Sequence, residues 1–338
     1  MSTTLPSFPR LLGDVGGTNA RLAVINALGE PIRHVCHLPT RDFPSLQTAI
    51  EHYLADLAAQ GALTHRPRWA SLGIASPIVG DEVRMMNHDW SFSMQGLKQS
   101  LGLDRLCCLN DFNALAWGLP ALKPDHLVQI GGHHAEPGRS LALLGAGTGL
   151  GTSGLIPVPG QPGDLKPRWT ALVAEGGHVT LPARDQRELA VLGVLRRRWD
   201  HVSAERVLSG AGLVRLYEAV CVLQKEMPQP LAPADVTERG ISGQCQYCAE
   251  AIDLFCHFLG TVASDLALSL GALGGVYIGG GIVPKLGEVF VRSGFRERFE
   301  DKGRYRDYLG PVPVYVIHDP HAALLGAAMA LDLLPEMG

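Results

Sequence analysis

The chain has 338 residues and a formal net charge of −4, with 29 Lys and Arg against 33 Asp and Glu. Hydrophobic residues make up 46% of it and charged residues 18%, which excludes intrinsic disorder. At about 150 residues per domain, this length predicts two domains. The mildly acidic balance provides no basic surface for nucleic acid, and we expect no nucleic-acid partner.

The sequence predicts neither a secretory signal nor a membrane segment. Residues 1–10 lack an apolar core. The longest uncharged run, 266–283, contains six glycines and predicts a helix end, a turn and a buried strand. The seven cysteines are scattered and odd in number, which favours a reducing compartment over a disulfide framework. We therefore expect a cytoplasmic protein.

Apolar runs typical of strands alternate with helical patterns in the first part of the chain. Strands are predicted at 11–14, 20–25, 69–74 and 106–109, and a helix at 46–59. A further helix is expected directly after residues 110–111. This alternation is typical of an α/β protein with mostly parallel sheets.

A second unit of strand, glycine turn and strand begins about 130 residues after the first. The expected elements are strands at 141–144 and 152–156, a loop at 157–167, helices within 186–270, a strand at 276–278 and a helix opened by 279–281. Two such units predict two similarly built halves that hold a ligand between them.

The first glycine turn, Asp14-Val15-Gly16-Gly17-Thr18-Asn19, is suited to phosphate. Paired glycines let backbone N–H groups approach an anion, and Asp14 can hold Mg²⁺ directly or through water. A tight hairpin with a structural aspartate would have the same sequence. The second turn, 145–151, favours the phosphate interpretation, since a polyphosphate needs donors on both sides.

Two common nucleotide motifs are absent. The chain has no Gly-Lys dipeptide and therefore no P-loop. A Gly-x-Gly-x-x-Gly pattern occurs at 149–154, but Leu155-Ile156-Pro157 follows it where a dinucleotide-binding fold needs a helix. A nicotinamide-dependent enzyme is therefore a poor candidate.

Asn110 and Asp111 follow a predicted strand and precede a predicted helix. Ligands bind at this end of strands in open α/β sheets. Asp111 is suited to accept a proton from a hydroxyl that attacks phosphorus, and Asn110 to hold a neighbouring hydroxyl. The alternative is that Asp111 is the N-cap of the helix.

Three further polar residues are candidates for binding a small polar ligand. Glu175 and His178 flank a Gly-Gly pair, a spacing that can present both side chains to one ligand. The alternative is a turn with exposed ends. Glu205 lies early in a predicted helix and, alternatively, only complements its dipole.

Four residues near the middle of the chain, Cys245, Cys248, Cys256 and His257, suggest zinc only weakly. A second cysteine pair or a separated histidine is missing. The helical pattern around Phe255 favours buried, inert cysteines. Whether Cys245 and Cys248 bind a metal stays open at this point.

Together these segments resemble the bacterial glucokinase family of the actin–hexokinase superfamily. Eight stretches occur in the family's order from residue 11 to about residue 327: 13–22, Ser76-Pro77 with Gly80-Asp81, Asn87-His88-x-Trp90-x-Phe92-Ser93, Asn110-Asp111-Phe112, 145–151, Glu175-Gly176-Gly177-His178, 201–210 and 279–284. Each stretch is weakly specific by itself, whereas all eight in order are specific.

The resemblance implies an α/β, two-domain actin/hexokinase-like fold, each domain a mixed sheet flanked by helices, with a ligand cleft. It implies a small domain of residues 1–121 and 320–338, to which the last helix returns, and a large domain of residues 122–319. The implied reaction transfers the γ-phosphoryl group of ATP, with Mg²⁺, to the 6-hydroxyl of glucose, the entry step of glycolysis. A homodimer is also implied.

By the same resemblance, each candidate residue receives a role. Asp111 is implied as the general base that also contacts the sugar, and the other sugar ligands are Asn87, Asn110, Glu175, His178 and Glu205. The implied ATP-binding residues are Gly13, Asp14, Val15, Gly16, Gly17, Thr18, Asn19, Thr148, Gly149, Gly279, Gly280 and Gly281, with Asp14 at the metal. Met86 stands where the family usually has Thr.

Several alternatives share these features. The first is a kinase for another hexose or an amino sugar, and the second a non-catalytic sugar sensor on the same scaffold. A third is a phosphatase of the superfamily. The related repressor/kinase branch fits poorly, because no cysteine follows His178 until Cys221. The phosphate donor, the range of acceptors, the affinity, the regulation and the oligomeric state are not fixed by these motifs.

Overall fold

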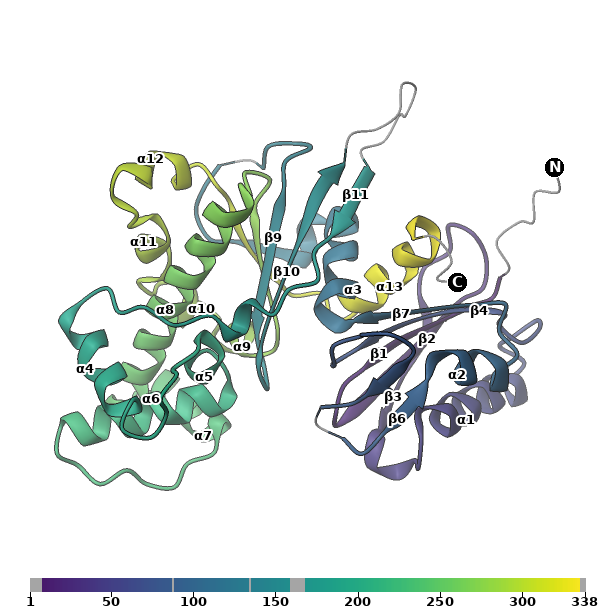
Figure 1. Cartoon of the computed structure of the whole chain (residues 1–338), viewed down its shortest axis with the longest axis horizontal. Helices are drawn as coiled ribbons and strands as arrows, with labels where there is room; N and C mark the ends of the chain where they lie inside the picture. The colour runs from purple at the N-terminus through teal and green to yellow at the C-terminus, as the bar shows by residue number, and fades with distance from the viewer. Residues whose placement is uncertain (1–7, 87, 134, 159–167, 335–338) are drawn as a thin grey trace. The chain divides into compact units, whose positions relative to one another are not determined.

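The computed structural model describes residues 8–86, 88–133, 135–158 and 168–334 (Figure 1). The chain forms two compact units. The first unit comprises Met1–Leu122 with Asp319–Gly338, and the second comprises Lys123–His318.

The first unit contains a five-stranded mixed sheet in the order β3-β2-β1-β4-β7. Its strands are β1 (Arg10–Val15), β2 (Asn19–Ile25), β3 (Arg33–Pro39), β4 (Trp69–Ile74) and β7 (Arg105–Asn110). The β1–β2 and β2–β3 pairs are antiparallel, whereas β1–β4 and β4–β7 are parallel. The carboxyl ends of β1, β4 and β7 therefore meet at one edge of this sheet.

Helices cover both faces of the first sheet, α3 and α13 on one and α1 and α2 on the other (Figure 1). The elements are η1 (Thr40–Asp42), α1 (Leu46–Ala59), α2 (Met94–Ser100), α3 (Asp111–Gly118), η2 (Leu119–Ala121) and α13 (Ala322–Leu333), with the small hairpin β5 (Glu82–Arg84) and β6 (Ser91–Ser93). Ser45 caps α1 by accepting a hydrogen bond from Thr48 N. Helix α13 packs against α3, β4 and β1, so the chain returns to this unit.

The second unit contains a six-stranded sheet in the order β11-β10-β9-β12-β13-β8. Its strands are β8 (Leu127–Gln129), β9 (Leu141–Ala146), β10 (Leu150–Val158), β11 (Arg168–Ala171), β12 (Val276–Gly279) and β13 (Val314–Ile317). The pairs β9–β12 and β12–β13 are parallel, and the other three are antiparallel. The order β11-β10-β9-β12-β13 repeats the pairing pattern of the first sheet.

Helices form most of the rest of the second unit. They are η3 (Pro124–His126), η4 (Gly176–His178), α4 (Gln186–Leu195), α5 (Ala204–Val207), α6 (Gly210–Leu223), α7 (Pro233–Ile241), α8 (Gln246–Leu270), α9 (Ile282–Leu286), α10 (Glu288–Val291), α11 (Phe295–Glu300), η5 (Gly303–Tyr305) and α12 (Arg306–Leu309). Helix α8 contacts α6, α7, α11 and β9, and is the central helix of this core.

Among the described residues, α8 alone is long and apolar enough to cross a membrane. Of its most apolar stretch, 72% is buried inside the second unit. Phe255, Phe258 and Leu259 on this helix are fully buried. The apolar length of α8 is therefore explained by its place in a protein core.

The expected fold class is confirmed: each unit is a mixed sheet flanked by helices. The expectation of mostly parallel sheets was wrong, because each glycine turn joins an antiparallel hairpin at one side of its sheet. The predicted helix 46–59 and strand 69–74 match α1 and β4 residue for residue. Of the predicted loop 157–167, Pro157 and Val158 belong to β10, and residues 159–167 lie outside the described residues.

Candidate active site

The first glycine turn connects β1 to β2. Gly16 N donates to Asn19 O at 2.9 Å, and Thr40 Oγ1 donates to Gly17 O at 2.8 Å, which ties the turn to η1. Thr18 and Asn19 are exposed, and a Cβ on Gly16 would approach nothing closer than Asn19 O at 3.4 Å. The turn therefore presents open backbone and two neutral polar side chains to a ligand.

Gly13 and Val15 lie inside β1 and are buried. A Cβ on Gly13 would lie 2.6 Å from Leu72 Cδ2, so this glycine permits close packing of β1 on its neighbour. Val15 O accepts a hydrogen bond from Ala75 N at 2.9 Å. The structure thus gives both residues a place in the sheet ladder, and the open part of the turn begins at Gly16.

Asp14 lies near the end of β1 and forms an ion pair with Arg21 at 3.3 Å. Arg21 also donates to Pro320 O at 2.6 Å, which fixes the guanidinium. Burial raises the pKa of Asp14 above its ordinary value, and the charges of Arg21 and His37 oppose this rise. Asp14 is therefore a partly neutralised carboxylate of fixed orientation at the turn.

Asp111 is the first residue of α3, at the carboxyl end of β7. The N-cap of this helix is Asn110, whose Oδ1 accepts from Phe112 N at 3.0 Å and from Asn113 N at 3.3 Å. The alternative that Asp111 caps the helix was therefore wrong. Asn110 Nδ2 donates to Ser76 O at 3.4 Å, so both ends of this amide are engaged.

Burial raises the pKa of Asp111 to about 6, and the nearby charge of Asp14 contributes to the rise. Its Oδ1 accepts from Phe112 N at 2.9 Å, a bond that favours the charged form. A carboxylate whose pKa lies this close to neutrality is a general-base candidate, because it binds a proton readily and is still ionised at pH 7.

Sequence reasoning missed the glycines that seat α3. Gly73 in β4 faces this helix, where a Cβ would lie 3.0 Å from Ala114 Cβ. Gly118 and Gly326 allow α3 and α13 to touch, because a Cβ on Gly118 would lie 2.8 Å from Ala322 O. The available signal was a glycine inside a predicted strand, which marks a close backbone approach.

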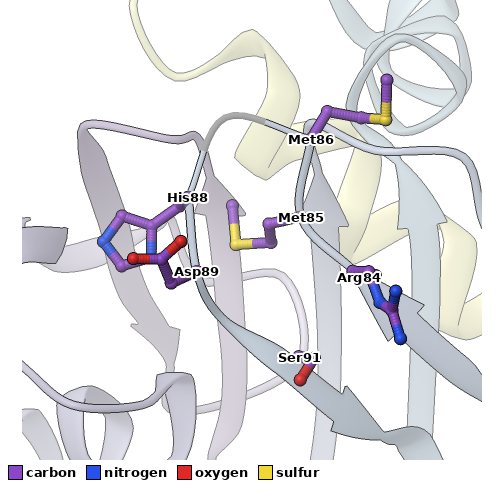
Figure 2. Close-up of a pocket in the computed structure, with 6 residues that line it drawn as sticks. All are labelled: Arg84, Met85, Met86, His88, Asp89 and Ser91. Atoms are coloured by element: carbon purple, nitrogen blue, oxygen red, sulfur yellow. The ribbon is translucent and has the colours of Figure 1, made fainter.

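A cavity of about 640 Å³ lies at the β5–β6 hairpin, lined by Arg84, Met85, Met86, His88, Asp89 and Ser91. Figure 2 shows Met86 directed away from Met85, and Met86 is 73% exposed whereas Met85 is buried. The predicted sugar ligand Asn87 lies outside the described residues.

In the second unit, Glu205 is held against the second glycine turn. Leu150 N, at the start of β10, donates to Glu205 Oε2 at 3.0 Å. A Cβ on Gly149 would collide with this carboxylate oxygen, whereas a Cβ on Gly147 would meet nothing within 4 Å. Thr148 between them is exposed. Glu205 thus has a specific partner, and the alternative that it only complements its own helix was wrong.

Glu175 is the N-cap of η4 and His178 is its last residue. Their side chains are largely exposed and lie 4.0 Å apart, measured from Oε2 to Nε2. Gly176 and Gly177 between them are held by specific contacts. Gly176 N donates to Thr152 Oγ1 at 2.9 Å, and a Cβ on Gly177 would collide with Leu150 O. Because these two residues have no side chain, η4 packs directly against β10.

The structure brings three of the predicted sugar ligands into one neighbourhood. Element η4 contacts both β10 and α5, the helix that carries Glu205. Thr180 pairs with Ser203 across a short bridge, and Ala204 N donates to Val179 O at 2.9 Å. Glu175, His178 and Glu205 are thereby grouped around the first residues of β10.

Gly279, Gly280 and Gly281 connect β12 to α9. Gly280 has a φ of 79°, and a Cβ there would collide with the backbone of Ala146 at the end of β9. Only glycine satisfies both conditions. Gly280 and Gly281 are exposed, so this turn offers open backbone beside the second glycine turn.

Among the residues that the structure describes, no group of three His, Cys, Asp or Glu side chains is placed to hold a metal ion. This finding covers Cys245 and Cys248 together with their neighbour Cys221. A three-ligand group is not required for Mg²⁺, because this ion is often bound by one or two carboxylates, water and substrate phosphates. Asp14 is such a carboxylate.

These features define the class of protein. Two units share one strand order and carry glycine turns, and one of them presents a carboxylate of raised pKa at a helix start. This is the architecture of a phosphoryl-transfer enzyme with an actin–hexokinase type of fold.

Comparison with known proteins identifies the family within this class. Residues 11–334 match the family model described as Glucokinase. The chain is 51% identical to a glucokinase of Aromatoleum aromaticum over 326 residues, 96% of this chain and 95% of that protein. It is 48% identical to a glucokinase of Chromobacterium violaceum over 332 residues, 98% and 92% of the two chains.

The fold agrees with this assignment. The crystal structure of a glucokinase from an Antarctic psychrotroph superposes with a TM-score of 0.85 at 36% identity, covering 96% of this chain and 99% of that one. The chain belongs to the glucokinase family. It is accordingly a kinase, and therefore a transferase.

Proposed function

We propose that this kinase transfers the γ-phosphoryl group of ATP to the 6-hydroxyl of glucose, giving glucose 6-phosphate and ADP. The observation that carries the mechanism is the position of Asp111, at the start of α3 with its pKa raised to about 6. The relatives named above are glucokinases at 51% and 48% identity, which supports glucose over other hexoses or amino sugars.

In this mechanism Asp111 accepts the proton of the sugar hydroxyl as that oxygen attacks the γ-phosphorus. A positioned base contributes about 10²–10⁴ in rate. Asp111 Oδ1 accepts from Phe112 N at 2.9 Å, and we assign the other carboxylate oxygen to the hydroxyl. Asn110 is fixed at both ends of its amide and holds a neighbouring hydroxyl.

The remaining sugar hydroxyls are bound by Glu175, His178 and Glu205, with Asn87 as a further ligand. Glu205 keeps one oxygen on Leu150 N, and its other oxygen is available to the sugar. A pocket built from such groups rejects an analogue that lacks a hydroxyl by about 10⁴–10⁵, because the polar groups are then left unpaired.

The glycine turns hold the phosphates. We assign Gly17, Thr18 and Asn19 as phosphate donors from the first turn. Gly16, whose N–H donates to Asn19 O, shapes this turn, and Gly13 and Val15 support it in β1. Thr148 and Gly149 act from the second turn, and Gly279 to Gly281 approach the adenosine. Asp14 would hold Mg²⁺ directly or through water, and the bound ion would supply charge neutralisation on the phosphoryl oxygens.

Further parts of the proposal concern context. We propose that the two units are the small and large domains of this fold and that the chain acts in the cytoplasm at the entry of glycolysis. Seven free thiols agree with a reducing compartment. A homodimer is proposed from the family resemblance alone, and light scattering at several protein concentrations tests it.

The decisive experiment offers ATP and Mg²⁺ with a panel of hexoses and amino sugars and measures the sugar 6-phosphate formed. Glucose is expected to give the highest kcat/KM. A matched assay of free phosphate identifies phosphatase activity, and an ADP or polyphosphate arm identifies another donor. Phosphorylation of glucose slower than that of a different sugar would assign the enzyme to that sugar instead.

A further inference from the structure

Outside the candidate active site, the second unit contains a Cys-x-x-Cys pair at the start of its longest helix. Cys245 is the N-cap residue of α8, and Cys248 is the third residue of that helix. Both thiols are free, Cys245 half-buried and Cys248 buried. Positions three apart at a helix start place their side chains on one face, and the two thiols lie within hydrogen-bonding reach of each other.

Cys245 of this pair lines a cavity of about 390 Å³ formed by α6, α7, α8 and the segment after α6, and Cys248 is buried behind it. Cys221 and Cys245 contribute to its wall, and its two charged members are Glu226 and Arg239. Its other lining residues are Tyr217, Met227, Gln229, Gln244 and Tyr247. Met227 is 90% exposed, so small solutes reach the cavity from solvent.

The two thiols differ in chemistry. Burial opposes ionisation of Cys245, but the backbone amides of Cys248 and Tyr247, the Cys248 thiol and the Arg239 charge outweigh it and lower its pKa. Burial and the neighbouring Cys245 raise the pKa of Cys248 to about 12. A half-buried thiol of lowered pKa beside a buried thiol of raised pKa is the arrangement of an attacking and a resolving cysteine.

We propose that Cys245 is a hydroperoxide-reactive thiol and that Cys248 resolves its oxidised form as a reversible intrahelical disulfide. The fold places Cys245 and Arg239 on the wall of one cavity, at the start of α8, with the Cys248 thiol in contact with Cys245. A metal site is not favoured, because the cysteines around this cavity form no three-ligand group among the described residues.

The chemistry balances with hydrogen peroxide or an organic hydroperoxide as oxidant. The Cys245 thiolate attacks one peroxide oxygen, the O–O bond breaks, and hydroxide or alkoxide leaves with the proton supplied by solvent. Cys248 sulfur then attacks the sulfenic sulfur, its proton leaves with the hydroxyl group as water, and the S–S bond forms. The two thiols supply the two electrons that reduce the peroxide, and a dithiol reverses the step.

The test uses the full-length chain and a limiting amount of hydrogen peroxide at pH 7. The thiols titratable after denaturation are expected to fall by two from the original seven, and the peptide that contains both cysteines to lose about 2 Da. Dithiothreitol is expected to restore both. A loss of thiols spread over other cysteines would overturn the proposal.

Single substitutions separate the two roles. Cys245→Ser is expected to abolish the disulfide, and Cys248→Ser to leave a sulfenic acid at Cys245 that dimedone traps. Cys36→Ser is the matched control, because Cys36 is also half-buried but burial and Asp56 raise its pKa. Continued loss of two thiols in Cys248→Ser would show that another residue, such as Cys221, resolves the intermediate, and would overturn the assigned pair.

The native chain provides a test that needs no cysteine variant. With a limiting alkylating agent at pH 7, peptide mapping is expected to show Cys245 modified about tenfold faster than Cys36, since the thiolate is the reactive form. Arg239→Gln is expected to slow this modification several-fold, and Arg239→Lys to restore it. Equal rates at the two cysteines would refute the reactive role of Cys245.

Discussion

Replacing Asp111 with Asn tests the assigned base through stability as well as activity. The pKa of this carboxyl is raised from its ordinary value of 3.8 to about 6, chiefly by burial. The folded state therefore holds the Asp111 proton more tightly than the unfolded state does. Ionisation of this residue at neutral pH costs folding free energy, and an amide of the same shape removes that cost.

The magnitude follows from the shift. Roughly two pKa units at 1.36 kcal/mol each give an upper value of about 3 kcal/mol, and partial exposure of the side chain reduces it to about 1–3 kcal/mol. The contribution of the protonated carboxyl is fully present below about pH 4 and is lost as the pH rises through 6. Asp111→Asn is therefore expected to be more stable than the wild type at pH 8 and equally stable near pH 4.

The assay is urea unfolding of both proteins at pH 4, 6 and 8, combined with glucose phosphorylation at pH 8. Turnover is expected to fall by about 10²–10⁴ while stability at pH 8 rises. Asp200→Asn, at an exposed position, is the matched control and is expected to change neither. A variant that is no more stable at pH 8, or whose stability difference does not depend on pH, would refute the environment assigned to Asp111.

Three further predictions follow from single contacts. Asp14→Asn removes a like charge near Asp111 and should lower the pKa of Asp111. In the pH profile of the residual kcat/KM, the acidic limb is expected to shift from about pH 6 to lower pH, and an unshifted limb would contradict the interaction between the two carboxyl groups. Gly149→Ala displaces the Glu205 carboxylate and is expected to raise the KM for glucose about 10–100-fold, as for loss of one charged hydrogen bond, whereas Gly147→Ala leaves it unchanged. Glu188→Gln weakens the buried pair with Arg298, 2.5 Å long, and is expected to cost about 3 kcal/mol in urea unfolding; Glu250→Gln, in a half-exposed pair with Arg187, is expected to cost under about 1 kcal/mol.

The elements that could be predicted from the sequence are those whose own residues determine them. Helix α1 has an apolar face and a capping serine at Ser45, and β4 is a short run of buried residues, so local pattern sufficed for both. Strand β3 was not predicted, because it is an edge strand whose residues are mostly exposed or half-buried, and His34 within it has a φ of 53°. Its pairing with β2 is a tertiary contact without a local signature.

The candidate residues could be found from sequence motifs, but the role of each residue could not be assigned from them. Asn110 and Asp111 are adjacent and both favour a helix start, so sequence alone left open which one caps α3. The structure separates them: the cap amide is Asn110, and the Asp111 carboxylate has its pKa raised by burial. Burial depends on the packing of α13 and β4 around the helix, which no local pattern reports.

The glycine motifs could likewise be recognised from the sequence, whereas the structural role of each glycine could not. A Cβ on Gly16 in the first turn would make only an ordinary contact with Asn19 O at 3.4 Å, whereas at Gly149 and Gly177 protein atoms occupy the space of a Cβ. The atom facing Gly149 is the carboxylate oxygen of Glu205, so this position controls a proposed sugar ligand rather than only a phosphate. Open space beside Gly147 in the same turn makes the two positions a matched pair, in which one methyl group reaches the Glu205 carboxylate and the other does not. A difference between their effects on the KM for glucose would therefore separate the positioning of Glu205 from any general requirement for a flexible turn.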